Sequence, residues 1–228
     1  LVLPVLHVLT RHTWTGMQHL PRTGGVIIVP NHVSHFDPLV VAHWIYGIGR
    51  WPRFLGKASL WRIPVLGPFL RKVQQIPVER GSVEAVKSLD VLVDAIKQGG
   101  VVVIYPEGTT TRSPDLWPMR GKTGAARLAL ATGAPVIPLA NWGAERIFDP
   151  RTNRLSLRPR TPVSVMAGPP IDLSRWQQAA PTRVVLDQMT DAIMHELNRM
   201  LGELRGEKPP AQLYDRSAPR ARTAEDAG

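Results

Sequence analysis

Short runs of β-branched residues recur along this chain and alternate with segments of helical periodicity. Continuous apolar runs of this kind are typical of strands that are buried on both faces of a sheet. The predicted strands are residues 26–29, 73–78, 101–105 and 136–140, with one or two more within 155–168. Strands that alternate with helices predict an α/β domain.

The segments between these runs carry the spacing of amphipathic helices. Residues 82–98 have apolar side chains at helical spacing, with Ser82 as the expected N-cap and a glycine pair after the last turn. Further helices are expected from Pro38 onward, at 124–132 and at 182–204. We therefore predict one domain over residues 21–204, with a mixed, mostly parallel sheet flanked by helices.

The two ends of the chain differ from this domain. Residues 1–20 are predicted to form an apolar, membrane-contacting helix followed by a mixed turn. Residues 205–228 have no periodicity and are predicted to be a disordered tail. No apolar run approaches the roughly 18–20 residues of a spanning helix. The chain begins without Met, so an anchor upstream of Leu1 stays an open alternative.

Positive charge is the strongest signal in the composition. The chain has 28 Lys and Arg against 18 Asp and Glu, a net charge of +10, which predicts an anionic partner such as nucleic acid, an anionic membrane or a phosphorylated molecule. We predict no nucleic-acid partner, because the chain lacks the signatures of common nucleic-acid-binding modules. The absence of cysteine excludes disulfides, thiolate metal sites and cysteine nucleophiles.

A basic segment at residues 50–72 has aromatic residues interleaved with its Arg and Lys side chains. Cations attract anionic head groups and Trp suits the membrane interface, so the segment predicts contact with an anionic membrane surface. The alternative is that Trp51, Trp61 and Phe69 are core residues of a helical subdomain.

Two polar clusters follow predicted strands, at the position where α/β sheets bind ligands. His32 and Asp37 follow residues 26–29, and Glu107 and Arg112 follow residues 101–105. A carboxylate on one ring nitrogen of a histidine fixes its tautomer and leaves the other nitrogen to take a proton from a hydroxyl.

The residues around His32 leave other interpretations open. A helix-capping Asp37 beside a loop histidine is one of them. A serine hydrolase using Ser34 is another, although no Gly-x-Ser-x-Gly elbow surrounds it. A metal site built from His32, His35 and Asp37 is a third, although the spacing differs from the His-Glu-x-x-His zinc motif. We predict no metal.

Taken in order, the motifs over about residues 20–170 resemble the glycerolipid acyltransferase family, the 1-acylglycerol-3-phosphate acyltransferases and their glycerol-3-phosphate relatives. The blocks that carry this resemblance are Asn31-His32-x-Ser34-x-x-Asp37, the stretch from Lys57 to Ile76-Pro-Val-Glu-Arg80, Tyr105-Pro-Glu-Gly-Thr109, and Lys122-Thr-Gly124. In the family Arg-Ser directly follows Glu-Gly-Thr. Here Thr110 stands at that position and Arg112-Ser113 comes two residues later.

The resemblance implies transfer of a fatty acyl group from an acyl thioester, on coenzyme A or acyl carrier protein, to a hydroxyl of lysophosphatidic acid. The product would be phosphatidic acid, made at the cytoplasmic face of the membrane by a peripheral or monotopic enzyme without a resident cofactor. Glycerol 3-phosphate or another lipid alcohol is the alternative acceptor, and a non-catalytic lipid-binding protein is the alternative class.

The resemblance also implies roles for individual residues. His32 would be the general base, oriented by Asp37, and backbone N–H groups of the 31–34 turn would hold the oxyanion. Arg80, with Lys57 and Arg112, would bind the acceptor phosphate, and Glu107 would position its glycerol hydroxyls. The full expected substrate-binding set is Asn31, Ser34, Lys57, Arg80, Glu107, Gly108, Thr109, Arg112 and Lys122.

Overall fold

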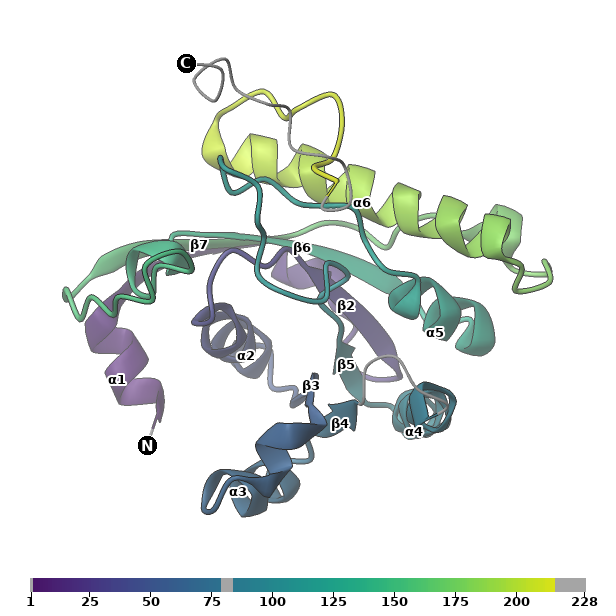
Figure 1. Ribbon diagram of the computed structural model, residues 1–228, viewed down its shortest axis with the longest axis horizontal. Coiled ribbons are helices and arrows are strands. Elements are labelled where there is room, and N and C mark those ends of the chain that lie inside the picture. Colours follow the sequence, from purple (N-terminus) through teal and green to yellow (C-terminus); the bar gives the residue numbers. More distant parts are fainter. Residues whose placement is uncertain (1, 79–83, 216–228) are drawn as a thin grey trace, which may run out of the picture.

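Seven strands form one sheet with helices on both faces in the computed structural model, which describes residues 2–78 and 84–215 (Figure 1). The strand order is β1-β7-β6-β2-β5-β3-β4, and every neighbouring pair is parallel except β6 and β7. This arrangement confirms the predicted mixed, mostly parallel sheet. The strands are β1 (Thr10–Thr15), β2 (Val26–Pro30), β3 (Pro52–Lys57), β4 (Ile76–Val78), β5 (Val101–Val103), β6 (Val136–Trp142) and β7 (Thr161–Ala167).

Strand β2 lies at the centre, between β5 and β6, and all five of its residues are buried. Its alternate side chains enter two separate apolar cores. Ile28 packs on the side of α2 (Asp37–Gly47). Helix α1 (Val2–Leu9) contacts α2 on this same side. Ile27 and Val29 pack on the opposite side, under α4 (Glu84–Lys97), α5 (Gly124–Thr132) and α6 (Arg183–Arg205). Burial on both faces explains why β2 is a continuous apolar run.

The structure adds two strands that the sequence did not predict. Strand β1 occupies residues placed in a mixed turn, so the N-terminal helix ends at Leu9. Strand β3 lies within the basic segment. Both carry polar or basic side chains that are partly exposed, so neither shows the apolar run on which the prediction relied. No helix among residues 2–78 and 84–215 is both long enough and apolar enough to cross a bilayer.

Residues 206–215, which the sequence places in a disordered tail, contact the domain. Residues 206–215 bond to the domain: the Asn198 side chain donates to the Pro210 carbonyl at 3.1 Å, and the Arg120 N–H donates to the Tyr214 carbonyl at 3.0 Å. These bonds place residues 206–215 on the domain surface rather than in a disordered tail. Residues 216–228, and the expected N-cap Ser82, lie outside the described residues.

The rest of the basic segment forms a short 3-10 helix, η2 (Ala58–Arg62), followed by α3 (Leu66–Lys72). Figure 1 shows α3 set apart from the sheet, beyond β3 and β4. Trp51 and Phe69 are 52% and 53% exposed, so the core interpretation is wrong for both. Trp61 is half-buried.

Candidate active site

The loops after β2 and β5 meet because the two strands are parallel neighbours, with Ile28 opposite Val103. The His32 N–H donates to Glu107 Oε1 at 2.9 Å, and the Thr111 N–H donates to the His32 carbonyl at 2.7 Å. The two polar clusters therefore come together at the carboxyl edge of the sheet, as the strand order predicts.

His32 and Asp37 form a direct pair. The distance between His32 Nδ1 and Asp37 Oδ2 is 2.9 Å, and the Asp37 side chain is fully buried while that of His32 is 12% exposed. Helix α2 begins at Asp37 with Pro38 in its first turn, which fixes the carboxylate beside the loop. With Nδ1 facing the carboxylate, Nε2 is the ring nitrogen left to exchange protons.

Asp37 also organises the backbone of the loop. Its Oδ2 accepts from the Val33 N–H at 2.7 Å and from the Ser34 N–H at 2.9 Å. Burial raises the pKa of Asp37, and the hydrogen bonds from His32, Ser34 and Val33 oppose that rise. The N–H groups of residues 32–34 are thus engaged by two carboxylates. They are not free to hold an oxyanion, contrary to the expectation for this turn.

Glu107 holds two loops together. Its Oε1 accepts from His32 and its Oε2 accepts from the Met119 N–H at 3.0 Å. Burial raises the pKa of Glu107 to about 8, although these hydrogen bonds work in the other direction. Because both oxygens face backbone N–H groups, this geometry makes Glu107 a positioning residue for the His32 loop. Binding of glycerol hydroxyls by Glu107 stays a prediction.

Tyr105 is a site residue to which the sequence assigned no role. Its ring stacks on His32, with centroids 4.1 Å apart and planes inclined by 28°. The Tyr105 ring also stacks with Phe54 of β3, with centroids 6.4 Å apart. The Tyr105 ring thus contacts both His32, in the loop after β2, and Phe54 of β3. Tyr105 is the first residue of the Tyr105-Pro-Glu-Gly-Thr109 block, and this position was the sequence signal that could have assigned it to the site.

Asn31 and Ser34 are engaged within the protein. The Asn31 amide donates to the Asn141 carbonyl at 3.0 Å and accepts from the Asn141 N–H at 2.7 Å. The Ser34 hydroxyl donates to the Phe148 carbonyl at 2.7 Å and accepts from the Phe36 N–H. Since the Ser34 hydroxyl proton points away from His32, the geometry does not support a serine nucleophile. Asn141 and Phe148 had no local sequence signal.

Gly108 and Lys122 lie together on the edge of the site. Gly108 has a φ of +71°, and a Cβ there would lie 3.2 Å from the end of the Lys122 side chain. The Lys122 N–H also donates to the Pro106 carbonyl at 2.8 Å. The positive φ and this close approach explain the need for glycine. Thr109, which follows, is half-buried.

The expected phosphate-binding cations are less closely placed. Lys57 is exposed at the carboxyl end of β3, the same edge of the sheet as His32. Arg112 is exposed one residue after Thr111, the residue that contacts the His32 carbonyl. Arg80 lies outside the described residues. The structure therefore brings Lys122 into the site loops and leaves the other three as predictions.

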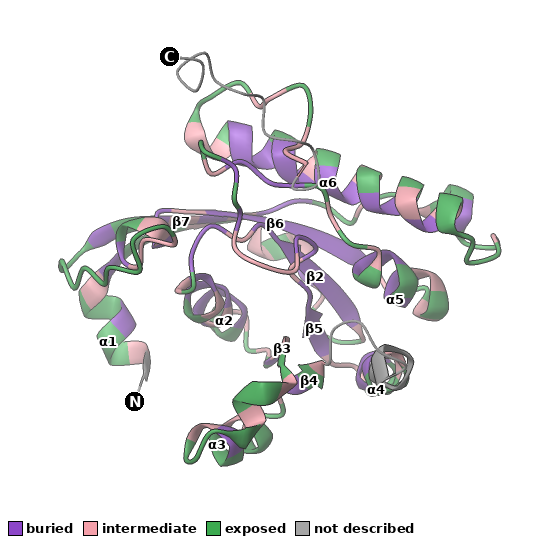
Figure 2. Cartoon of the chain, viewed as in Figure 1, coloured by how far each residue is buried: buried purple, intermediate pink, exposed green. Residues whose placement is uncertain are grey.

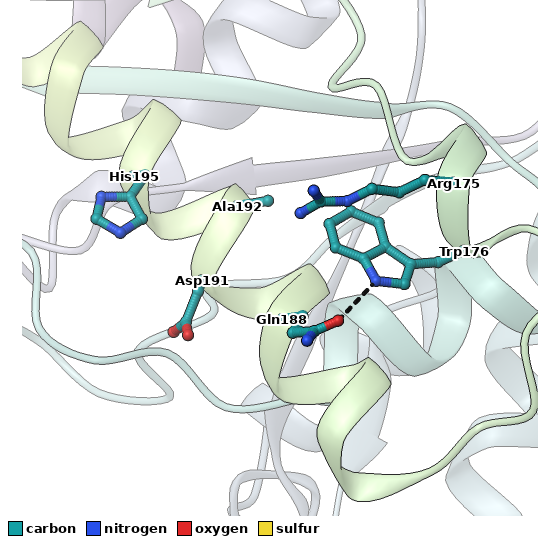
Figure 3. A pocket seen from close by; sticks show the side chains of 6 residues that line it. All are labelled: Arg175, Trp176, Gln188, Asp191, Ala192 and His195. Atoms are coloured by element: carbon teal, nitrogen blue, oxygen red, sulfur yellow. Dashed lines mark hydrogen bonds between the residues drawn. The ribbon is translucent and has the colours of Figure 1, made fainter.

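Other features of the described residues lie apart from this site. The rings of His32 and His35 are 6.2 Å apart, and no group of three potential metal ligands gathers in residues 2–78 and 84–215. Figure 3 shows a surface hollow along α6, where Trp176 donates to Gln188 beside Arg175 and His195. None of its lining residues belongs to the His32 site.

Fold and site together define an α/β enzyme with a histidine held by a buried carboxylate at the carboxyl edge of its sheet. Comparison with known proteins agrees with that class. The model of the Acyltransferase family matches residues 11–142, and the chain belongs to this family. It is an acyltransferase.

Individual relatives have narrower names. The chain is 28% identical over 179 residues to the 1-acyl-sn-glycerol-3-phosphate acyltransferase of Borreliella burgdorferi, covering 77% of this chain and 68% of that protein. It is 29% identical over 135 residues to the chloroplastic 1-acyl-sn-glycerol-3-phosphate acyltransferase BAT2 of Brassica napus, covering 58% of this chain and 38% of the relative.

A solved structure shares the fold. The crystal structure of the 1-acyl-sn-glycerophosphate (LPA) acyltransferase PlsC from Thermotoga maritima matches with a TM-score of 0.65 at 22% identity, covering 89% of this chain and 76% of that one. At this identity the likeness establishes the fold alone.

Proposed function

We propose that this enzyme transfers a fatty acyl group from an acyl thioester to a hydroxyl of lysophosphatidic acid, giving phosphatidic acid for phospholipid synthesis. The observation that carries the proposal is the contact between His32 Nδ1 and the buried Asp37 carboxylate at the carboxyl edge of the sheet. The acceptor follows from the relatives, which are 1-acyl-sn-glycerol-3-phosphate acyltransferases. The donor thioester is on coenzyme A or acyl carrier protein.

In the proposed mechanism, His32 Nε2 takes the proton of the acceptor hydroxyl as its oxygen attacks the thioester carbonyl. A carbon–oxygen bond forms, and the carbon–sulfur bond then breaks. The imidazolium returns its proton to the leaving thiolate, so the products are an ester and a free thiol. Asp37 stabilises the imidazolium while it exists. No step of this mechanism uses a metal or a resident cofactor.

The surrounding cations fit a phosphorylated acceptor. Lys57, Arg112 and Lys122 are exposed near the edge of the sheet where His32 lies, and we propose that they bind the acceptor phosphate together with Arg80. We extend the proposal to an anionic membrane surface as partner and to a peripheral or monotopic position at its cytoplasmic face. The lysophospholipid acceptor is itself an amphiphile of such a surface.

The decisive experiment measures thiol release from an acyl-CoA with lysophosphatidic acid, glycerol 3-phosphate or no acceptor. Release that needs lysophosphatidic acid in the wild type, and that is lost in His32→Ala, is the expected result. A preference for glycerol 3-phosphate would change the acceptor and keep the mechanism. Release without acceptor would replace the proposal with a thioesterase. The same assay with an acyl carrier protein thioester decides the donor.

A further inference from the structure

The η2–α3 hairpin, residues 58–72, presents apolar side chains that nothing in the described chain covers. Figure 2 shows α3 coloured mainly as exposed and partly exposed. Five of the thirteen large apolar side chains exposed in the described residues fall within residues 51–69. They are Trp51 at 52%, Leu60 at 37%, Ile63 at 45%, Val65 at 85% and Phe69 at 53% exposed. Exposed apolar side chains gathered in this way mark an interaction surface.

Val65, at the turn between η2 and α3, is the most exposed of these side chains. Its φ is 69° and its ψ is −50°. A β-branched residue rarely adopts a positive φ, and such outliers concentrate at functional positions. The folded chain thus holds an apolar side chain outward in an unfavourable backbone conformation, and burial within the chain does not compensate for it.

The residues where the η2–α3 hairpin meets the sheet are held by hydrogen bonds and close packing, which argues against a loose surface loop. The Gln75 side chain accepts from the Phe54 N–H at 2.7 Å and donates to the Val73 carbonyl at 2.7 Å. A Cβ at Gly67 would lie 2.2 Å from the Trp61 carbonyl, and one at Gly56 would lie 2.9 Å from the Trp61 ring. The two glycines let Trp61 pack back on β3 while the tip residues Ile63, Val65 and Phe69 stay exposed.

The charge around the tip has one sign. Residues 38–78 contain no Asp or Glu. Of the cations in this span, Lys57, Arg62, Arg71 and Lys72 are exposed, and none of the four forms an ion pair with a described side chain of residues 3–78 or 89–215. An apolar tip ringed by exposed cations, with no ion pair among the described side chains, matches an anionic lipid surface, which offers hydrocarbon below a layer of phosphate.

The hairpin is also connected to the site. It begins immediately after Lys57, where β3 ends at the carboxyl edge of the sheet. Phe54 of the same strand stacks against Tyr105, which stacks on His32. A surface that binds the hairpin therefore comes to the edge of the sheet that carries the base.

We propose that the tip of the η2–α3 hairpin, residues Ile63, Val65 and Phe69, inserts into an anionic phospholipid bilayer with Arg62, Arg71 and Lys72 at the level of the head groups. The functional reason for this insertion rests on the proposed function, since a lysophospholipid acceptor resides in the bilayer. The physical basis of the insertion, an exposed apolar tip ringed by exposed cations, is independent of that function. The hairpin then delivers the acceptor to the edge that holds His32.

Flotation of the full chain with vesicles tests the insertion. Wild type should float with vesicles of equal parts phosphatidylglycerol and phosphatidylcholine, and high salt should weaken its binding. The double variant Val65→Ser/Phe69→Ser should lower the partition coefficient at least about tenfold. The matched control Val91→Ser/Val184→Ser changes two side chains that are 51% and 63% exposed on α4 and α6, and should bind as wild type.

The cations are tested in the same way. Arg71→Gln/Lys72→Gln should weaken binding about fivefold for each charge removed. Arg154→Gln/Arg158→Gln removes two exposed cations elsewhere and should have little effect. Wild type that stays out of the vesicle fraction, or tip variants that float like wild type, would overturn the proposal. Hairpin-dependent capture of an acidic acyl carrier protein without vesicle binding would overturn it in favour of a protein partner.

Activity separates this inference from the proposed function. The tip variants should keep wild-type turnover on a short-chain lysophosphatidic acid dissolved as monomer, and should lose turnover on the same head group embedded in vesicles. Equal losses on both substrates would contradict a docking role. If wild type turns over neither substrate, the proposed function fails, and flotation by itself still decides whether the hairpin binds lipid.

Discussion

The Glu107 carboxylate accepts a hydrogen bond from the His32 backbone N–H at 2.9 Å. This bond joins the loop after β5 to the loop that carries His32. The other oxygen of Glu107 accepts from Met119, so one buried side chain fixes both loops. The contact explains why a carboxylate follows β5 without requiring it to touch substrate.

Glu107 predicts a specific dependence of stability on pH. Burial raises its pKa from 4.5 to about 8. Between these values the folded chain holds one more proton than the unfolded chain, so the free energy of unfolding falls as pH rises, by up to about 1.4 kcal/mol per pH unit. In Glu107→Gln this contribution disappears. At about pH 5, where the folded wild type holds Glu107 protonated, the variant should be less stable by about 1–3 kcal/mol, because its NH₂ group faces a backbone N–H.

Urea denaturation of both proteins from about pH 5 to about pH 8 measures this effect, as the difference between their unfolding free energies. That difference should shrink as pH rises. Groups that titrate in both proteins cancel in the subtraction. A difference that stays constant across the range would mean that Glu107 is ionised throughout.

Asp37→Asn should lower kcat by about 10²–10⁴-fold with a much smaller change in KM. The amide oxygen can still accept from Nδ1, so the ring stays oriented, but the imidazolium loses its counter-charge. Thiol release measures the rate, and Asp172→Asn, in an exposed loop position, is the control. Wild-type turnover in Asp37→Asn would remove the carboxylate from the mechanism.

Asn31 and Asn141 should behave as a coupled structural pair. Each exchanges hydrogen bonds with the other across 110 residues of sequence, and both are buried. Asn31→Ala or Asn141→Ala leaves the partner unsatisfied and should cost about 1–3 kcal/mol of stability. The double variant should lose about 0.5–3 kcal/mol less than the sum of the single losses.

Denaturation of the four proteins gives the coupling energy, and acceptor KM distinguishes the two roles of Asn31. A structural role predicts a KM close to that of wild type in the folded variant. A large rise in KM without loss of stability would instead support the substrate-binding role expected from sequence.

Tyr105 should contribute through its ring and not through its hydroxyl. The hydroxyl is buried and has no hydrogen-bond partner among the described residues. Tyr105→Phe should therefore retain both stability and turnover. Tyr105→Leu loses the stack on His32 and should cost about 0.5–1.5 kcal/mol beyond the change in packing, with lower turnover. Thermal melts and thiol release check both variants, and a loss of turnover in Tyr105→Phe would give the hydroxyl a role.

The central fold was predictable because parallel strands buried on both faces have a distinctive composition. Residues 26–29 and 124–132 are described almost as expected, as β2 and α5. Strands β1 and β3 were missed because partly exposed strands can carry Arg, His and Lys. Tertiary pairing with β7 and β5, rather than local propensity, makes them strands.

The candidate site was also predictable only in part. His32, Asp37 and Glu107 were found because their residue types and spacing carry chemistry, and parallel strands bring their loops together. The partners of Glu107 and Asp37 are mainly backbone N–H groups, which have no sequence signature. The bonds engage the N–H groups of residues 32–34 within the turn expected to hold the oxyanion, and they make Glu107 a positioning residue. Only the folded geometry shows these two consequences.

Lys57 and Arg112 should each contribute to binding of the acceptor phosphate. Charge-assisted hydrogen bonds contribute about 1.5–3 kcal/mol, so Lys57→Gln and Arg112→Gln should each raise KM for lysophosphatidic acid about tenfold or more. Neither should change KM for a monoacylglycerol, which has no phosphate. Lys97→Gln removes an exposed cation at the end of α4, shortly before β5 begins and so at the opposite edge of the sheet, and should leave both values unchanged. One outcome would separate the two cations: Lys57→Gln raises KM for lysophosphatidic acid, and Arg112→Gln leaves both KM values unchanged. Arg112 would then not replace the arginine that the family has directly after Glu-Gly-Thr. Lys57 would then hold the phosphate without it.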